Sequence, residues 1–181
     1  MRGKSATSTE ARVANSPGVR QVGNNTLKTG DRLPDVQMLG ESGHVRLWDY
    51  VGGRPVVVYF YPRDNTPGCT AQACAFRDAH DEFAAMGAQV IGISADNLAS
   101  HAQFRERYRL PFPLFADESG EVAAAFGVAQ GWLPGRVTFV ADADGMIRYV
   151  FDSQLRVGAH VKRAKEEIAK LLRGDSALGH I

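Results

Sequence analysis

A run of six apolar residues, Val56 to Tyr61 (VVVYFY), constrains the fold of this chain more than any other stretch. Continuous β-branched and aromatic residues are typical of a strand buried on both faces of a sheet. Val90 to Ser94 forms a second such strand. Between them a helical pattern runs from Pro67 to Met86 and stops at Gly87, a residue well suited to a C-terminal cap. Strand, helix and strand in this order predict a sheet covered by helices.

The rest of the chain continues this alternation of strand-like and helix-like segments. We expect an N-terminal hairpin (Val36 to Leu39 with Val45 to Leu47) and a second hairpin (Val137 to Val140 with Ile147 to Phe151). We also expect two helices with polar caps, from Asp96 to Tyr108 and from Ser119 to about Gly127, and a last helix from His160 to Arg173. The last helix carries one apolar stripe, formed by Val161, Ala164, Ile168 and Leu171. This order predicts an α/β chain with a thioredoxin-like fold, in which helices flank a central mixed β-sheet and an N-terminal β-hairpin is added.

Length and composition favour a single domain. A chain of 181 residues can bury an ample core without a disulfide or a metal, and we expect one domain over residues 28–175. Residues 1–28 carry five basic side chains against one acidic one and few large apolar residues, so 1–27 are expected to form a flexible tail, as are 176–181. The basic tail also resembles an organelle transit peptide, although an expression scar or a disordered leader fits as well. The cytoplasm, a reducing compartment, is the expected location, with an organelle as the alternative.

Several classes of partner and site are disfavoured by the sequence. A net charge of +1 and a pI near 7.8 argue against nucleic acid or an acidic membrane surface as the main partner. There is no run of the ~18 apolar residues that a membrane helix needs. The histidines and cysteines form no zinc-like cluster. Asp142 to Gly145 (DADG) resembles the opening of a calcium loop but lacks the remaining ligands, which favours a hairpin turn.

The chain has two cysteines, Cys69 and Cys74, both near the start of the predicted 67–86 helix. Pro67 suits the first helical position, which makes Thr66 the N-cap, and we expect its hydroxyl to reach the backbone N–H of Cys69. The first turn of a helix favours an anion and therefore a thiolate. Pro62, at the end of the strand, is expected to cover the sulfur and exclude water. Cys69 is thus a candidate nucleophile, although a cysteine facing a core is also often a small hydrophobic residue.

Helical geometry separates the two sulfurs. Cys69 shares a core-facing stripe with Ala73, Phe76, His80 and Phe83, whereas Cys74 lies on the polar face. In an intact helix the two Cα atoms would be about 8.6 Å apart, and a disulfide tolerates about 7 Å. A disulfide between these cysteines therefore requires the first turns of the helix to unwind. His80 lies about 16 Å along the helix from Cys69, which is too far for a Cys/His pair.

The stretch YFYPRDNTPGCTAQACAFRD resembles the signature of the peroxiredoxins, specifically the bacterioferritin comigratory protein or peroxiredoxin Q group. The family pattern P-x-x-x-T-x-x-C falls on Pro62, Thr66 and Cys69, and the second cysteine of the group falls on Cys74. GISADNLASHAQFRERYRLPFPLFADESGEVAAAFGV and GRVTFVADADGMI extend the resemblance over about residues 28–173. Two features depart from the family: the segment 129–135 is short, and Gln72 stands where glutamate is frequent.

The resemblance implies that Cys69 is the peroxidatic cysteine, oxidised to a sulfenic acid, and that Cys74 resolves it as an intramolecular disulfide. It also implies that Arg136 is the active-site arginine, which stabilises the thiolate and the developing charge on the peroxide. Hydrogen peroxide and organic hydroperoxides would be the substrates, and thioredoxin or a glutaredoxin-like dithiol the reductant. No metal, flavin or haem is implied. Two thiols on one chain suit a monomer and are compatible with a dimer.

Two other functions stay open at this point. A thioredoxin-like thiol-disulfide oxidoreductase is disfavoured by the C-x-x-x-x-C spacing, because such enzymes use C-x-x-C. A non-catalytic module could sense redox state or hold clients through the unwound helix. Outside the family pattern, Arg136 would be read as a surface or ion-paired arginine.

Overall fold

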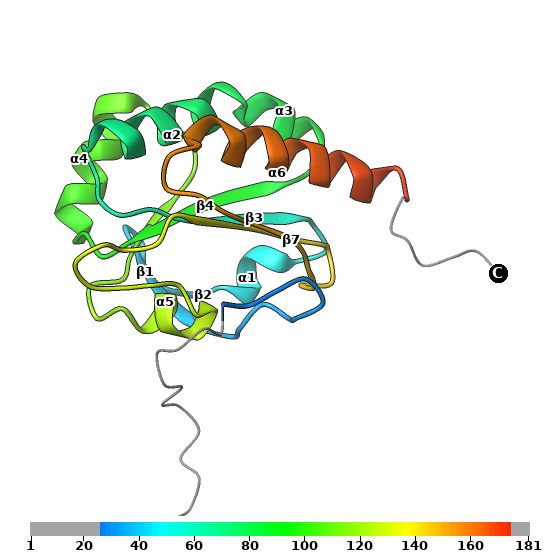
Figure 1. Cartoon of the computed structure of the whole chain (residues 1–181), viewed down its shortest axis with the longest axis horizontal. Coiled ribbons are helices and arrows are strands. Elements are labelled where there is room, and N and C mark those ends of the chain that lie inside the picture. Colours follow the sequence, from blue (N-terminus) through cyan, green and yellow to red (C-terminus); the bar gives the residue numbers. More distant parts are fainter. Residues whose placement is uncertain (1–25, 175–181) are drawn as a thin grey trace, which may run out of the picture.

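The structure is a computed structural model that describes residues 26–174 (Figure 1). Of the tails expected at 1–27 and 176–181, residues 1–25 and 176–181 lie outside the described residues, whereas Thr26 and Leu27 bond to Gly127 and Phe126. In the described part, one seven-stranded mixed sheet has the order β2-β1-β5-β4-β3-β6-β7. The strands are β1 (Gln37–Gly40), β2 (Gly43–Arg46), β3 (Val56–Phe60), β4 (Gln89–Ser94), β5 (Leu114–Ala116), β6 (Val137–Ala141) and β7 (Ile147–Asp152). The helices are α1 (Trp48–Val51), α2 (Pro67–Asp78), α3 (His80–Ala85), α4 (Leu98–Tyr108), α5 (Glu121–Phe126) and α6 (Val157–Leu172).

Strand β3 lies at the centre of the sheet. It pairs in parallel with β4 and antiparallel with β6, and all five of its residues are buried. Because strand side chains alternate between faces, Val58 and Phe60 enter one core, and Val57 and Tyr59 enter the other. The continuous apolar run in the sequence therefore serves two hydrophobic cores, one on each face of the sheet.

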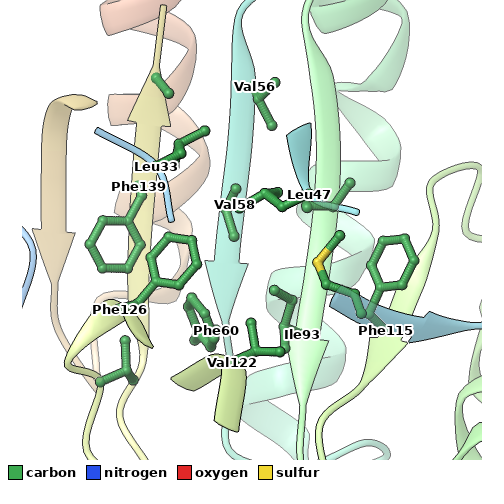
Figure 2. Close-up of a cluster of buried hydrophobic side chains, with 14 of the residues drawn as sticks. Leu33, Leu47, Val56, Val58, Phe60, Ile93, Phe115, Val122, Phe126 and Phe139 are labelled. Carbon is green, nitrogen blue, oxygen red and sulfur yellow. The ribbon is translucent and has the colours of Figure 1, made fainter. Parts of the chain in front are cut away.

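Helices cover both faces of the sheet (Figure 1). α2, α3, α4 and α6 contribute to the core that contains Tyr59, and α1 and α5 lie on the opposite face. On the α5 side the ring of Phe60 packs edge-on against Phe126 and Phe139, with centroids 4.9 and 6.0 Å away (Figure 2). The α/β class, the central mixed sheet flanked by helices and the N-terminal hairpin of the predicted thioredoxin-like fold are confirmed.

The long helix predicted over 67–86 is wrong as a single element. It is divided into α2 and α3 at Ala79, whose ψ of 0° lies outside the α-helical range. Both aromatic side chains of the stripe lie in the core on either side of the break, since Phe76 and Phe83 are fully buried with ring centroids 6.0 Å apart. The apolar period continues through the break, so periodicity alone could not reveal it.

Helix starts also differ from prediction. Asn97, and not Asp96, caps α4, through a bond from the backbone N–H of Ser100 at 2.9 Å. At α5 the hydroxyl of Ser119 accepts the first N–H of the helix, that of Glu121, at 3.3 Å, and the carboxylate of Asp117, which was not predicted, accepts the next two N–H groups. α6 begins three residues earlier than expected, at Val157. In residues 26–174 no helix has the length and apolar character needed to cross a bilayer.

Candidate active site

The junction between β3 and α2 carries most of the predicted site. Thr66 is the N-cap of α2, with extended dihedrals, and Pro67 follows at the first helical position, as expected. The expected bond from the Thr66 side chain to the N–H of Cys69 is wrong. The hydroxyl instead donates to the carbonyl of Arg63 at 3.0 Å, within the loop, and no side chain caps α2. The helix start is therefore held without the stabilisation that a side-chain cap supplies.

Cys69 lies in the first turn of α2 and is 1 % exposed. It joins the core under α2 together with Ala73, Phe76 and Phe83, which confirms the predicted stripe for these four residues, and His80 is half-buried. The sulfur thus lies where the first-turn N–H groups favour an anion and where bulk water is largely excluded.

Arg136 lies directly before β6, and the antiparallel pairing of Phe60 with Val137 brings it to the end of β3. Its Nη2 donates to the sulfur of Cys69 at 3.4 Å. Nη1 donates to Oε1 of Gln72 at 2.6 Å, and Nε donates to the carbonyl of Gln154 at 3.1 Å. Arg136 is 5 % exposed, so a fixed positive charge contacts the buried sulfur.

The approach of Arg136 depends on a glycine in α2. A Cβ placed on Gly68 would lie 3.2 Å from Nη2 of Arg136 and 3.9 Å from Cγ1 of Val157. A contact of 3.2 Å is tighter than ordinary packing, so a larger residue would displace the guanidinium. The absence of a side chain at this position lets the arginine reach the sulfur.

Gln72 lies one turn after Cys69 and is fully buried. Its carbonyl oxygen fixes one arm of Arg136, as an amide can do without charge. Its Nε2 has no hydrogen-bond partner among residues 26–174. An unpaired buried donor on the residue that holds the guanidinium is a group that can bind an incoming oxygen.

Cys74 is partly exposed and lies on the same uninterrupted helix as Cys69. Both are free thiols. Since α2 is intact over both positions, the geometric argument that a disulfide requires unwinding applies to the structure as it stands. Pro62 is half-buried in the β3–α2 loop, and its shielding of the sulfur stays a prediction.

No pattern in the sequence indicates the residues that support Arg136. His160 of α6 is buried between Thr138, whose hydroxyl is 2.8 Å from Nδ1, and the carbonyl of Ser153, 2.8 Å from Nε2. A carbonyl can only accept, so Nε2 carries the hydrogen. Burial lowers the pKa of His160 to about 4, and the charge of Arg136 acts in the same direction. Ser153 also donates its N–H to the carbonyl of Arg136 at 3.2 Å, so the histidine steadies the segment that holds the arginine.

The short segment 129–135 is tied to the same support. Gln154, whose carbonyl accepts from Arg136, donates its side-chain amide to the carbonyl of Pro134 at 2.7 Å. Trp132 is 97 % exposed at the tip of the segment. The segment 129–135 beside Arg136 is thereby held at Pro134 and exposes the aromatic side chain of Trp132.

One group of residues in the described part has ligand atoms close enough to hold a metal ion. These are Asp64, Asp96 and His101, whose ligand atoms lie within 4.8 Å of one another. Each of these side chains already makes hydrogen bonds to protein groups. A bound ion would have to replace those bonds.

Comparison with known proteins agrees with this geometry. The AhpC/TSA family profile matches residues 29–150. The chain is 42% identical over 160 residues to chloroplastic peroxiredoxin Q of Oryza sativa subsp. japonica, covering 86% of this chain and 74% of that protein. It is 48% identical over 148 residues to chloroplastic peroxiredoxin Q of Triticum aestivum, covering 80% and 68%.

Two solved structures of peroxiredoxins also align with this chain. The crystal structure of peroxidoxin BcpB from Mycobacterium tuberculosis aligns with a TM-score of 0.76 at 39% identity, over 80% of this chain and 97% of that one. Peroxiredoxin Q from Xanthomonas campestris aligns with a TM-score of 0.71 at 26% identity, over 80% and 98%.

Proposed function

Because this chain belongs to the AhpC/TSA family of peroxiredoxins, which are thiol peroxidases, we propose that it reduces hydrogen peroxide and organic hydroperoxides with Cys69 as the peroxidatic and Cys74 as the resolving cysteine. One observation above all supports this assignment. The Nη2 atom of Arg136 donates to the buried sulfur of Cys69 at 3.4 Å, which pairs a nucleophile with a fixed positive charge.

The first step is attack of the Cys69 thiolate on one oxygen of the peroxide. An S–O bond forms while the O–O bond breaks, and the other oxygen leaves as hydroxide or alkoxide and takes up a proton. The sulfur loses two electrons and becomes a sulfenic acid. Arg136 stabilises the negative charge on the thiolate and then on the leaving oxygen, and Nε2 of Gln72, which has no partner in the described residues, offers a donor for the peroxide.

The second step joins the two sulfurs. The Cys74 thiolate attacks the sulfenic sulfur of Cys69, an S–S bond forms, and hydroxide leaves and is protonated to water. The first turns of α2 must unwind for the sulfurs to meet. The start of α2 suits this step because no side chain caps it.

A dithiol reductant closes the cycle. One thiolate of thioredoxin or a glutaredoxin-like donor attacks the disulfide, and its second thiol releases the mixed disulfide, so two electrons pass from donor to peroxidase. The partly exposed Cys74 is the more accessible of the two sulfurs for this attack.

The setting of this activity is also a proposal. We place the activity in one domain over residues 28–175, in a monomer, with a dimer as the alternative. The two plant relatives above are named as chloroplastic proteins. An organelle is therefore the alternative to the cytoplasm for this chain, with residues 1–27 as the segment that would direct it there.

Peroxide consumption coupled to a thioredoxin system tests the proposal on the wild type, Cys69→Ser and Cys74→Ser. Cys69→Ser should be inactive, and Cys74→Ser should consume about one equivalent before stalling as the sulfenic acid. Equal steady-state rates in the three proteins would refute the peroxidase assignment. Rapid insulin reduction without peroxide turnover would instead indicate a thiol-disulfide oxidoreductase.

A further inference from the structure

The loop between β3 and α2 is anchored by one buried carboxylate, that of Asp64. Its Oδ1 accepts from the hydroxyl of Tyr61 at 2.5 Å, and its Oδ2 accepts from Oγ of Ser100 at 2.8 Å and from Nδ1 of His101 at 2.7 Å. Ser100 and His101 belong to the first turns of α4, where the helix dipole also favours a negative charge. The carboxylate therefore ties the loop to α4.

The backbone of Asp64 is held as well. Its N–H donates to Oδ2 of Asp96 at 2.8 Å, and the same oxygen accepts from the hydroxyl of Ser94 at 2.6 Å. Ser94 ends β4 and Asp96 follows it, so this second attachment reaches the neighbouring parallel strand. The loop is thus fixed through the side chain and the main chain of one residue.

Both ring nitrogens of His101 make hydrogen bonds in this arrangement. Its Nδ1 faces the carboxylate of Asp64, and its Nε2 lies 3.0 Å from the carbonyl of Phe115. A carbonyl only accepts, so Nε2 donates to Phe115, and Nδ1 shares a hydrogen bond with the carboxyl group of Asp64. The ring is fully buried, and its contact with Asp64 is direct, with no water or metal ion needed between the two groups.

The firm attachment ends shortly before the reactive cysteine. Asn65 has a φ of 60°, a left-handed turn that asparagine tolerates, and the hydroxyl of Thr66 donates back to the carbonyl of Arg63 within the loop. Asp64 precedes Cys69 by five residues, and α2 between them starts without a side-chain cap. A rigid anchor therefore borders a helix start that is easily released.

We propose that the Asp64–His101 pair is a positioning device for the peroxidase reaction: it holds the β3–α2 loop so that Cys69 stays beside Arg136 for attack, and it opposes the unwinding that disulfide formation needs. This inference rests on the function proposed above. The pair acts through the position of Cys69 and touches neither peroxide nor sulfur. Its strength sets how often a sulfenic acid is resolved by Cys74 before a second peroxide oxidises it to the sulfinic acid with release of water.

Asp64→Asn tests the proposal, because it keeps the shape of the side chain and removes its charge. Rapid quench and mass spectrometry of the full-length protein give the rate of Cys69 oxidation and the ratio of sulfinic acid to disulfide at a fixed hydrogen peroxide concentration. We expect slower oxidation and a lower ratio, each by about 2- to 30-fold, the range for substitutions that shift a two-state balance. Ser100→Ala, which removes one hydrogen bond without leaving a charge unpaired, should give a smaller change in the same directions.

Asp142→Asn is the matched control. Its carboxylate also makes three hydrogen bonds, to the backbone N–H groups of Asp144 and Met146 and to Nε of Arg148, but it organises the β6–β7 turn at the opposite end of β6 from Arg136. This variant should lose stability while leaving the ratio of sulfinic acid to disulfide unchanged. Equal changes in the ratio for Asp64→Asn and Asp142→Asn would overturn the proposal.

Three outcomes distinguish the proposed function from the proposed positioning role of Asp64 and His101. A wild type that never forms a sulfenic acid would refute the function and with it the positioning role. If the wild type cycles normally and Asp64→Asn has the same ratio of sulfinic acid to disulfide as the wild type, the positioning role alone is refuted. A rise in Tm with Mn²⁺ or Zn²⁺ in the wild type that Asp64→Asn lacks would assign the group to a metal and overturn the positioning role.

Discussion

Replacing Arg136 by methionine should slow the reaction of Cys69 with hydrogen peroxide. The guanidinium makes one charge-assisted contact with the sulfur, at 3.4 Å, in a site where the arginine is 5 % exposed. A hydrogen bond to a charged group contributes about 1.5–3 kcal/mol, and each ~1.4 kcal/mol is tenfold in rate. The expected loss is therefore about 10- to 150-fold. Arg136→Lys should fall between the wild type and methionine, because an ammonium keeps the charge but cannot serve the sulfur, Gln72 and Gln154 together.

The rate of attack is best measured in a Cys74→Ser background, where resolution cannot follow. Stopped-flow or rapid-quench trapping of the sulfenic acid over a range of peroxide concentrations gives the second-order rate constant. Alkylation by iodoacetamide on the same proteins should slow less than peroxide attack, because no oxygen anion leaves in that reaction. Arg77→Met, on the same helix but paired with Asp78 and the carbonyl of Tyr108, is the control and should react normally.

A native far-UV spectrum together with a peroxide rate constant within twofold of the parent would show that the arginine does not stabilise the reacting charges. If the rate constants of peroxide attack and of alkylation fall by the same factor, Arg136 acts only on the thiolate and not on the leaving oxygen. Either result would contradict the reasoning above.

Three further predictions follow from the same geometry. Gly68→Ala should slow peroxide attack about 2- to 12-fold by pushing Nη2 of Arg136 from the sulfur, whereas Gly158→Ala, whose added Cβ meets nothing within 4 Å, should react normally; equal rates for the two variants would contradict the steric argument. His160 has its pKa lowered by burial from 6.5 to about 4, so its contribution to stability is complete above pH 6.5 and is lost as the pH falls towards 4, by at most about 3 kcal/mol. Urea unfolding between pH 7.5 and 4.5 should show this loss in the free energy of unfolding, and His160→Asn should depend less on pH. An equal pH dependence in both proteins would rule out the contribution of His160. Hydrogen exchange in the first turns of α2 should accelerate in the disulfide form while α6 keeps its protection, and unchanged exchange in α2 would show that the bond forms without unwinding.

Part of the fold could be predicted because local patterns and burial agree. The run over Val56–Phe60 is apolar on both faces, as a central strand must be, and the stripe through Cys69 and Phe76 matches a helix on a core. The short strand β5 and the short helix α1 have no such pattern in the sequence. β5 has three residues and α1 has four, and their positions depend on the neighbouring strand and core more than on local sequence.

The environment of the site was less accessible to sequence reasoning. A hydroxyl at an N-cap has several acceptors and donors within reach, and Thr66 selects the carbonyl of Arg63 because the loop turns back there. Asp64 and His101 are 37 residues apart in the sequence and meet only because β4 lies beside β3. Charged residues at such separation carry no periodic signal, so tertiary structure is needed to pair them.

Together, the contacts around α2 suggest why its start is held from two sides and not by its own cap. In the proposed cycle Cys69 must be held in a reactive geometry for attack, and the proposed supports are Arg136, just before β6, and the attachment of Asp64 to α4. The same residue must leave its place in each proposed cycle, and a strong side-chain cap would stabilise the folded helix start by about 1 kcal/mol and so slow resolution. Fixing the surroundings while leaving the helix start weakly held satisfies both demands. A substitution that gave α2 a true cap should therefore favour the sulfinic acid over the disulfide, the opposite of what loosening Asp64 should do.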